Sequence, residues 1–230
     1  TCALPICRQK PAESVFLAGS GTEVPVSYSW ADIHDGDDGS DGAIISARNI
    51  SERKVAEQRI RYLARIDALT KVPNRMQFQH LLQRAIARAK RRGHRLGLLY
   101  LDVDRFKDIN DTFGHMAGDA SLETLTSRVG KLLPDGAFMG RLAGDEFGIV
   151  VRLEGDRESN ERFLSSLASE LLRGINEVLI VQGHELYITA SVGIACFPSD
   201  ADNVLDLIRN ADAALYVAKG SGGNRSELYN

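Results

Sequence analysis

The hydrophobic and polar positions form two textures along the chain, and the change between them falls near residue 51. Before that point, short apolar runs at 15–17, 24–30 and 43–48 are separated by stretches rich in Gly, Ser and Asp. Short runs bounded by such residues are typical of strands joined by turns. The first fifty residues are therefore predicted to form strands.

The charged stretch that begins at Ser51 carries one narrow apolar stripe at helical spacing. Its members are Val55, Ile60, Leu63 and Ile66. This spacing predicts a linker helix over 51–66. A narrow stripe on a charged helix often pairs with its own copy in a coiled coil, so we expect dimerisation through it, with docking on a neighbouring domain as the alternative.

Beyond residue 67, helical and strand-like patterns alternate. Helices are predicted over 75–92, 105–110, 117–132, 158–178 and 203–219. Strands are predicted at 96–103, as a hairpin over 137–152, and as a pair within 178–196. This mixture indicates an α+β fold, an α/β sandwich in which helices flank a central, mostly antiparallel sheet.

The composition fits one substantial domain and a smaller piece. The chain has 230 residues, 43% of them hydrophobic, and a formal net charge of −3. This charge gives no global attraction to nucleic acid or anionic membranes, so neither is expected as a partner of this segment. Three cysteines, Cys2, Cys7 and Cys196, lack metal-ligand spacing and fit a reducing compartment. We expect a cytoplasmic fragment, which in a longer protein could follow a membrane anchor.

An acidic loop at 35–42 resembles a calcium-binding loop only superficially. An EF-hand needs flanking helices and a Glu at the twelfth loop position, where this chain has Ser46. We therefore interpret this stretch as a solvated hairpin loop.

The candidate chemistry begins late on the strand predicted at 96–103. A period of two places Asp102 on the face opposite Leu101, near the end of a buried strand. An ionised carboxylate there is costly unless a cation pairs with it, which leaves a metal or a salt bridge. Asp145 and Glu146 fall at the tip of the predicted hairpin. Because Mg²⁺ prefers a few carboxylates together with water and phosphate oxygens, we favour a metal site for phosphoryl chemistry.

Polar residues cluster in 104–119, directly after this strand. Lys107 and the backbone amides at the start of the next helix are suited to phosphate. Asn110 and Asp119 suit a guanine edge, because the carboxylate can accept from the ring N–H and the exocyclic amine while the amide satisfies the carbonyl oxygen. Adenine lacks that amine, so the pair would discriminate against it. His115 belongs to the same cluster.

Five ordered blocks resemble the GGDEF family of diguanylate cyclases. They are Asp67-Ala68-Leu69-Thr70 with Pro73-Asn74-Arg75, the block 102–119, Ala143-Gly144-Asp145-Glu146-Phe147, Ser191-Val192-Gly193-Ile194-Ala195, and the block 211–219. Any single block is weak evidence for this resemblance, but five blocks in the same order are specific. For residues 67–230 the resemblance implies a fold similar to nucleotidyl cyclase and polymerase palm domains. It also implies condensation of two GTP molecules into cyclic di-GMP with release of two pyrophosphates.

The resemblance further implies a role for each matching residue. Metal contacts to Mg²⁺ or Mn²⁺ are implied for Asp102, the backbone carbonyl of Val103, Asp145 and Glu146. Asp145 is implied as the proton acceptor for the 3′-hydroxyl, with Glu146 supporting the metal site. Substrate contacts are implied for Lys107, Asn110, His115, Asp119 and Lys219. Each domain is expected to bind one GTP, so the reaction needs two domains that face each other in a homodimer.

Residues 42–54 resemble the last strands of a PAS sensor domain that runs into a signalling helix. We therefore expect 1–50 to be the C-terminal part of a PAS-like domain and 51–66 to be the signalling helix. Too little of the sensor is present for a complete ligand pocket.

Several departures from the family pattern bear on activity. Ala143 replaces the commoner first Gly of the hairpin motif, which is a small change unless that position needs a positive φ. Lys71 replaces the usual Gly of the opening motif. Gly223 stands where many relatives have an Arg, and Arg225 is a candidate substitute. The product-inhibition motif is missing, since 134–137 read Pro-Asp-Gly-Ala, so feedback inhibition through that site is not expected.

Two classes of function remain open. An active diguanylate cyclase predicts turnover that needs Mg²⁺, Asp102 and Asp145. A catalytically silent GTP-binding or dimerisation module that relays a sensory signal is supported by the missing Arg and the altered Gly positions. A cyclic di-GMP receptor is disfavoured because the inhibitory motif is absent. An adenylyl cyclase or a polymerase leaves Asn110 and Asp119 without a role.

Overall fold

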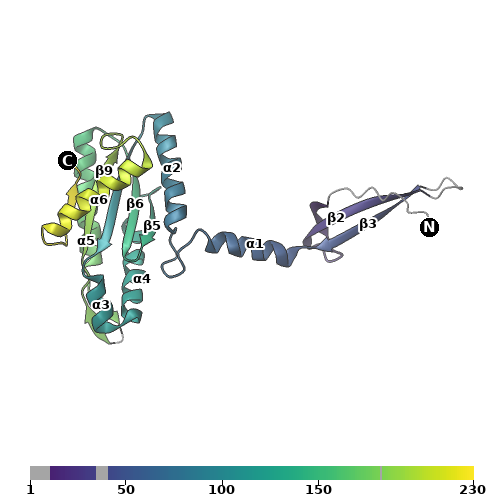
Figure 1. Cartoon of the computed structure of the whole chain (residues 1–230), viewed down its shortest axis with the longest axis horizontal. Helices are drawn as coiled ribbons and strands as arrows, with labels where there is room; N and C mark the ends of the chain where they lie inside the picture. The colour runs from purple at the N-terminus through teal and green to yellow at the C-terminus, as the bar shows by residue number, and fades with distance from the viewer. Residues whose placement is uncertain (1–10, 35–40, 182) are drawn as a thin grey trace. The chain divides into compact units, whose positions relative to one another are not determined.

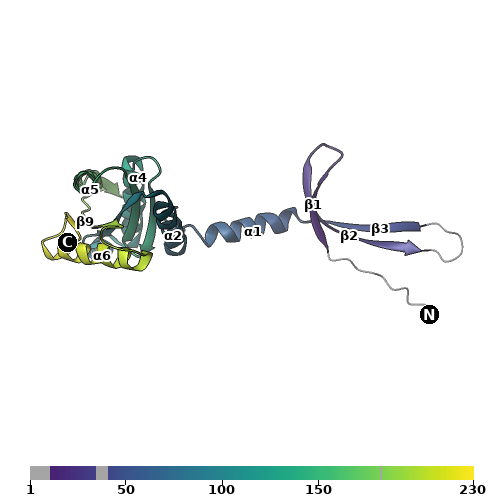
Figure 2. The ribbon, with the colours of Figure 1, turned by 90° about the horizontal axis from the view of Figure 1, so that it is seen from above.

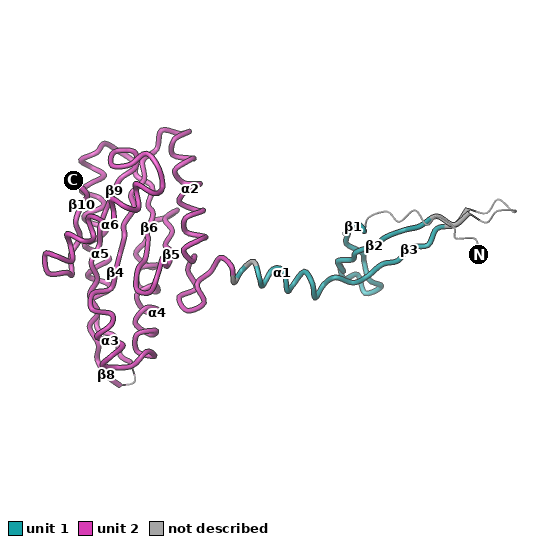
Figure 3. Tube along the Cα trace, in the orientation of Figure 1, with its two compact units in different colours: residues 1–62 teal, residues 63–230 magenta. Residues whose placement is uncertain are grey.

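Two units make up the chain in its computed structural model, Thr1–Tyr62 and Leu63–Asn230 (Figure 3). The residues that the structure describes are 11–34, 41–181 and 183–230. Cys2, Cys7 and most of the acidic loop interpreted as a solvated hairpin loop lie outside them. None of the described helices is both long and apolar enough to cross a membrane.

The N-terminal unit is an antiparallel sheet followed by one helix. Its strands are β1 Ala12–Leu17, β2 Glu23–His34 and β3 Asp41–Asn49, in the order β1-β2-β3. Helix α1, Ser51–Leu63, begins two residues after Asn49, whose side chain accepts a hydrogen bond of 2.8 Å from the Ser51 amide. Glu13 of β1 forms ion pairs with Arg53 and Lys54, which fastens the first turn of α1 to the sheet.

The predicted strands of this unit are all present, with longer bounds than the apolar runs alone indicated. The predicted linker helix ends at Leu63, three residues earlier than expected. On its apolar stripe, Val55 is 64% exposed and Ile60 is 66% exposed. These two side chains therefore face solvent in the single chain.

The C-terminal unit places helices on both sides of one sheet (Figures 1 and 2). Its helices are α2 Arg75–Arg92, α3 Phe106–Phe113, α4 His115–Leu132, α5 Arg157–Ile175 and α6 Val204–Gly220. Its strands are β4 Arg95–Val103, β5 Phe138–Ala143, β6 Glu146–Leu153, β7 Leu179–Val181, β8 His184–Leu186, β9 Ala190–Phe197 and β10 Ser226–Leu228. The central order is β10-β9-β4-β6-β5, antiparallel except for β10 beside β9, and β7 pairs with β8 separately. The predicted α+β fold is confirmed.

Side-chain caps fix where several helices start. Asn74 accepts from the Gln77 amide at 3.1 Å before α2, and Asp156 and Asn203 cap α5 and α6 in the same way. Such caps satisfy backbone N–H groups that have no partner inside the helix. Gly93 ends α2 in the left-handed region, at φ 66°. The predicted bounds of α2 are confirmed because both of its ends are marked in the sequence.

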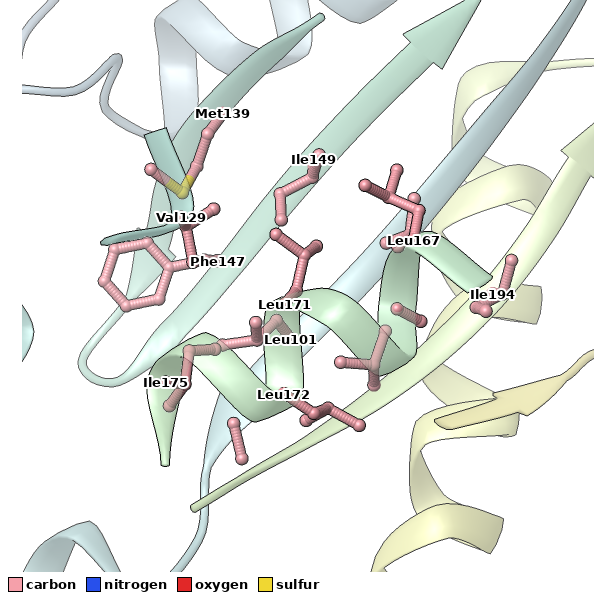
Figure 4. Packing of buried hydrophobic residues seen from close by; sticks show 14 of the residues in the cluster. Leu101, Val129, Met139, Phe147, Ile149, Leu167, Leu171, Leu172, Ile175 and Ile194 are labelled. Carbon is pink, nitrogen blue, oxygen red and sulfur yellow. The ribbon is translucent and has the colours of Figure 1, made fainter. Parts of the chain in front are cut away.

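The two faces of the central strand β4 bury two different hydrophobic clusters. One cluster joins Leu99 and Leu101 to α4 and α5, and Figure 4 shows Leu101, Phe147 and Ile149 beside Leu171 of α5. The other cluster joins Leu98 and Tyr100 to side chains of α2 and α6. Side chains alternate along a strand, so one strand serves both layers. Asp102 continues the row of Leu98 and Tyr100, toward α6.

Glycines in the sheet allow two elements to approach its backbone closely. A Cβ on Gly193 of β9 would lie 2.0 Å from the carbonyl oxygen of Ala211 in α6. Cβ atoms on Gly140 and Gly148, which are partners across β5 and β6, would collide with the Phe78 ring of α2. Helix α6 therefore rests directly on β9, which brings its C-terminal end toward the end of β4.

Several features of the C-terminal unit differ from the sequence predictions. The segment 178–196, predicted to hold a pair of strands, contains β7, β8 and β9, and the helix predicted over 158–178 ends at Ile175. The helices predicted at 105–110 and 117–132 are longer and are separated by Gly114 alone, which turns the chain at φ 83°. The three-residue strand β10 was not predicted. It pairs in parallel with β9 at the sheet edge, and so short a run carries no detectable alternation.

Candidate functional site

Asp102 lies at the end of β4, between the neighbouring strands of the sheet. Its backbone is opposite Glu146 of β6 on one side and Ser191 of β9 on the other. The Val103 amide donates to the Asp145 carbonyl at 3.3 Å, which fixes the turn between β5 and β6 beside the end of β4. The structure thus brings together the three predicted carboxylate positions and Val103, although the residues are about forty positions apart in sequence.

The Asp102 carboxylate is buried, with 7% of the residue exposed, and it is paired with a cation. Lys219 at the end of α6 places Nζ 2.6 Å from Asp102 Oδ1. The pKa of Asp102 is raised to about 6, mainly by burial; the Lys219 contact opposes this rise, and the charges of Asp145 and Glu146 add to it. Lys219 thus supplies a salt bridge to this carboxylate, and the metal site stays a prediction.

The donor set fits a divalent cation by charge. Within the described residues, no three His, Cys, Asp or Glu side chains are already gathered to hold a metal ion. The charges of Asp145 and Glu146 nevertheless act on the buried carboxylate of Asp102, and each opposes its ionisation. A site that concentrates negative charge in this way favours a bound cation, and carboxylate and carbonyl oxygens are the ligands that Mg²⁺ prefers.

Tyr100 holds Glu146 from inside the sheet. The Tyr100 hydroxyl donates to Glu146 Oε2 at 3.1 Å, and Tyr100 is only 9% exposed. Burial first, and then the Glu146 charge, raise the pKa of Tyr100, so the phenol keeps its proton. Sequence reasoning missed this residue, although strand alternation places it on the same face as Asp102.

Arg141 fastens the turn between β5 and β6 to the opening motif. Its Nε donates to the Gly144 carbonyl at 2.8 Å, and its Nη1 donates to Asp67 Oδ1 at 3.0 Å. Burial alone would raise the pKa of Asp67, but hydrogen bonds from Thr70 and Arg141 outweigh it and lower that pKa. This contact, which sequence reasoning also missed, ties residues 74 positions apart.

The departures from the family pattern have different structural settings. In the turn between β5 and β6, Gly144 has a positive φ of 38°, whereas Ala143 is not among the positive-φ residues of the described chain. The backbone at Ala143 therefore has no positive φ, and the methyl group does not strain it. Lys71, in contrast, has φ 61°, a conformation that favours Gly.

Asp104 holds the loop after α6 against the sheet. Its carboxylate accepts from Thr189 Oγ1 at 2.8 Å, from Ser191 Oγ at 2.7 Å and from the Asn224 amide at 2.9 Å. Gly223 lies beside it at φ 72°, and a Cβ there would be 3.1 Å from both carboxylate oxygens. The loop position that carries Gly223 is thus shaped by its contact with Asp104.

Arg225, the candidate substitute for a missing Arg, lies along a different side of the unit. Its Nη1 is 3.9 Å from Glu227 Oε1. It also lines a polar cleft with α5 residues Ser169 and Arg173. Lys219, not Arg225, is the cation in contact with Asp102.

The remaining predicted residues gather on the helical corner formed by α3, Gly114 and α4. Lys107 and Asn110 lie on α3, and His115 and Asp119 lie on the first turns of α4. All but the half-buried Asn110 are exposed. No side chain caps the N-terminus of α3, which follows Arg105. Across the described residues, no hydrogen bond or ion pair joins this corner to Asp102, so the site has two separate parts.

The comparisons with known proteins cover both parts of the site, the end of β4 and the corner between α3 and α4. Residues 64–225 match the family model "Diguanylate cyclase, GGDEF domain". The chain is 36% identical over 169 residues to the bifunctional diguanylate cyclase/cyclic di-GMP phosphodiesterase MucR of Pseudomonas aeruginosa, covering 74% of this chain and 24% of that protein. It is 33% identical over 174 residues to the cyclic di-GMP phosphodiesterase NbdA of the same organism, covering 76% of this chain and 22% of that protein. The chain thus spans about a quarter of the curated relatives it matches.

A solved structure shares the same architecture. It contains the coiled coil and GGDEF domain of DgcB from Caulobacter crescentus in complex with c-di-GMP. The match has a TM-score of 0.69 and 28% identity, and it covers 78% of this chain and 93% of that chain.

Proposed function

The chain belongs to the GGDEF diguanylate cyclase family, and we propose that its C-terminal unit condenses two GTP molecules into cyclic di-GMP with release of two pyrophosphates. The observation that carries this proposal is the buried Asp102 at the end of β4. It lies opposite Glu146, beside the turn that contains Asp145, and within 2.6 Å of Lys219. Such a convergence of acids with one cation serves to bind a metal-complexed triphosphate.

We assign the metal contacts to Asp102, the Val103 carbonyl, Asp145 and Glu146, with Mg²⁺ or Mn²⁺ as the ion. When bound, the cation supplies charge neutralisation on the triphosphate and lowers the pKa of the attacking 3′-hydroxyl. Asp145 accepts the proton of that hydroxyl. Tyr100 fixes the carboxylate of Glu146 so that it need not be ordered when substrate binds.

The helical corner recognises the nucleotide in this proposal. Asn110 and Asp119 read the guanine edge, and His115 lines the same part of the site. Lys107 and the uncapped N-terminus of α3 suit phosphate oxygens, because the amino end of a helix presents free N–H groups and a positive dipole. Lys219, whose Nζ lies 2.6 Å from Asp102 Oδ1, contacts a phosphate bound beside that carboxylate in this proposal.

The reaction needs two such units, each holding one GTP, so we propose a homodimer as the active form. The exposed stripe of Val55 and Ile60 on α1 supports pairing of two copies through this helix. The N-terminal strands are proposed to be the end of a PAS-like sensor that controls the pairing. A GTP-consuming reaction and the free, buried Cys196 fit a cytoplasmic location.

The test is incubation of the purified 230-residue chain with GTP and Mg²⁺ at several protein concentrations, followed by chromatographic separation of the nucleotides. We expect cyclic di-GMP to form at a rate that rises faster than linearly with protein concentration. Asp145→Ala is the control and should form no product. Product formation that persists in this variant would contradict the assignment of Asp145.

A second candidate is a catalytically silent module that binds GTP and relays a signal. The name of NbdA, a cyclic di-GMP phosphodiesterase with a segment similar to this chain, favours it, as does Lys71 in a backbone conformation that suits Gly. This candidate predicts GTP binding by equilibrium measurement and no product even at high protein concentration.

A further inference from the structure

Gly118 of α4 lies where the corner between α3 and α4 is most tightly packed. The two helices lie side by side, and Gly118 is buried between them (Figure 1). A Cβ built on Gly118 would be 2.0 Å from Asn110 Oδ1, 3.0 Å from Asn110 Cγ and 3.2 Å from Phe106 Cζ. The Asn110 carboxamide thus occupies the space that any larger residue at position 118 would fill.

The backbone at this corner has little room to relax. Gly114 alone connects the helices, its amide donates to the Asn110 carbonyl at 2.9 Å, and its carbonyl accepts from the Gly118 amide at 3.3 Å. The Phe106 ring lies one helical turn before Asn110 and borders the same space. The group that can move at least cost is the end of the Asn110 side chain, because it needs only a change of rotamer.

We propose that Gly118 is a positioning residue for base recognition, because its missing side chain lets the Asn110 carboxamide rest against α4 one residue from Asp119. This inference rests on the proposed function, in which Asn110 and Asp119 read guanine. A methyl group at position 118 displaces the carboxamide while leaving the fold intact, since Ala favours a helix more than Gly does. Gly118 then acts on specificity through Asn110 and touches no reacting atom.

The experiment compares Gly118→Ala with Gly130→Ala in the full 230-residue chain. Gly130 lies in the same helix, and a Cβ there meets nothing within 4 Å, so this control gains the same helix propensity without a collision. Dissociation constants are measured for GTP, for ITP, which lacks the exocyclic amine, and for ATP, with Mg²⁺ present. Steady-state KM and kcat are measured alongside, and thermal melting reports folding.

We expect Gly118→Ala to weaken GTP binding by at least about tenfold, the usual consequence of losing a buried, base-directed hydrogen bond. ATP binding should change less than about twofold, and the preference for GTP over ATP should fall accordingly. The KM for GTP should rise while kcat changes little, because the carboxylates at the end of β4 are untouched. Gly130→Ala should match the wild-type protein in nucleotide binding and kinetics, with a melting temperature that is equal or slightly higher.

Asn110→Ala and the double variant Asn110→Ala/Gly118→Ala separate positioning from general damage. If Gly118 acts through Asn110, adding Gly118→Ala to Asn110→Ala should cause no further loss of GTP affinity. Equal losses in both backgrounds, unchanged GTP affinity in Gly118→Ala, or a lower melting temperature with equal loss of GTP and ATP binding would each overturn the inference. Wild-type protein that binds no GTP would refute the proposed function, and the inference with it.

Discussion

The two parts of the site are built in opposite ways. At the end of β4, the buried Asp102 is paired with Lys219, and the half-buried Glu146 accepts a hydrogen bond from Tyr100. At the corner between α3 and α4, the side chains assigned to nucleotide recognition are exposed except for the half-buried Asn110, whose carboxamide occupies the space beside Gly118. The first part is ordered by hydrogen bonds and charge, and the second by shape.

This difference predicts how each part responds to substitution. Buried, paired groups contribute to stability and to chemistry together, because their removal leaves a partner unsatisfied. Exposed groups on a helix surface change stability by less than about 0.5 kcal/mol. Substitutions at the end of β4 should therefore alter both turnover and folding, and substitutions at the corner should alter nucleotide binding alone.

The largest effect is expected from Asp102→Asn at the end of β4. The amide keeps the shape but removes the negative charge, so cyclic di-GMP formation should fall by about a thousandfold or more. GTP binding through the corner should persist within a few-fold. Chromatographic rate measurements and nucleotide binding on the same preparation test both statements. Activity near the wild-type level in Asp102→Asn would show that the Asp102 carboxylate is not needed for the reaction.

The same residue gives a pH dependence that the corner should lack. The folded-state pKa of Asp102, about 6, lies above its ordinary value of 3.8. Its contribution to stability is therefore fully present below about pH 4 and is lost as pH rises through about 6, a change of up to about 3 kcal/mol. Denaturant unfolding in metal-free buffer from pH 4 to 8 should show this decline in the wild type relative to Asp102→Asn. Stability curves that run parallel would contradict the raised pKa.

A smaller effect is expected from Tyr100→Phe, which removes one hydrogen bond from inside the sheet. Glu146 then loses its partner, so kcat should fall by about tenfold and the Mg²⁺ concentration for half-maximal activity should rise. Tyr216→Phe, at a residue that is 80% exposed, is the matched control and should change neither kcat nor the Mg²⁺ dependence. Unchanged metal dependence in Tyr100→Phe would show that the hydrogen bond does not order Glu146 for function.

The smallest effect is expected from Lys107→Ala on the corner. The exposed ammonium contributes to phosphate attraction and little to folding, so the KM for GTP should rise about threefold and the melting temperature should not move. The rise should shrink at high ionic strength. Lys131→Ala, at an exposed residue of α4 beyond the corner, should change neither quantity. A lower melting temperature in Lys107→Ala, with no change in Lys131→Ala, would contradict the prediction that substitutions at the corner leave folding unchanged.

The sequence predicted the fold because its main determinants are local. Helix α2 was bounded correctly because Asn74 and Gly93 mark its ends, and the strand alternation around Asp102 placed it on the correct face. The corner residues were placed together because they lie within fifteen positions of one another in the chain. These are properties that a short window of sequence contains.

What the sequence did not predict depends on partners far apart in the chain. The pairing of Asp102 with Lys219 spans 117 positions, and the hydrogen bond from Asn224 to Asp104 spans 120. The role of Tyr100 requires knowing that β4 and β6 are neighbours in register. The proposed role of Gly118 depends on the absence of a Cβ atom beside Asn110, and the sequence alone does not reveal that the two residues are in contact. Strand register and interhelical contact, not composition, decide these points.

The contact between Lys219 and Asp102 means that the protein carries its own counter-ion. A buried carboxylate without a paired cation would destabilise the folded protein. Here Lys219, in the last turn of α6, supplies the positive charge. Folding therefore does not require a metal to neutralise Asp102, and the protein should fold in magnesium-free buffer. In the proposed reaction, magnesium would then be needed for turnover and not for folding.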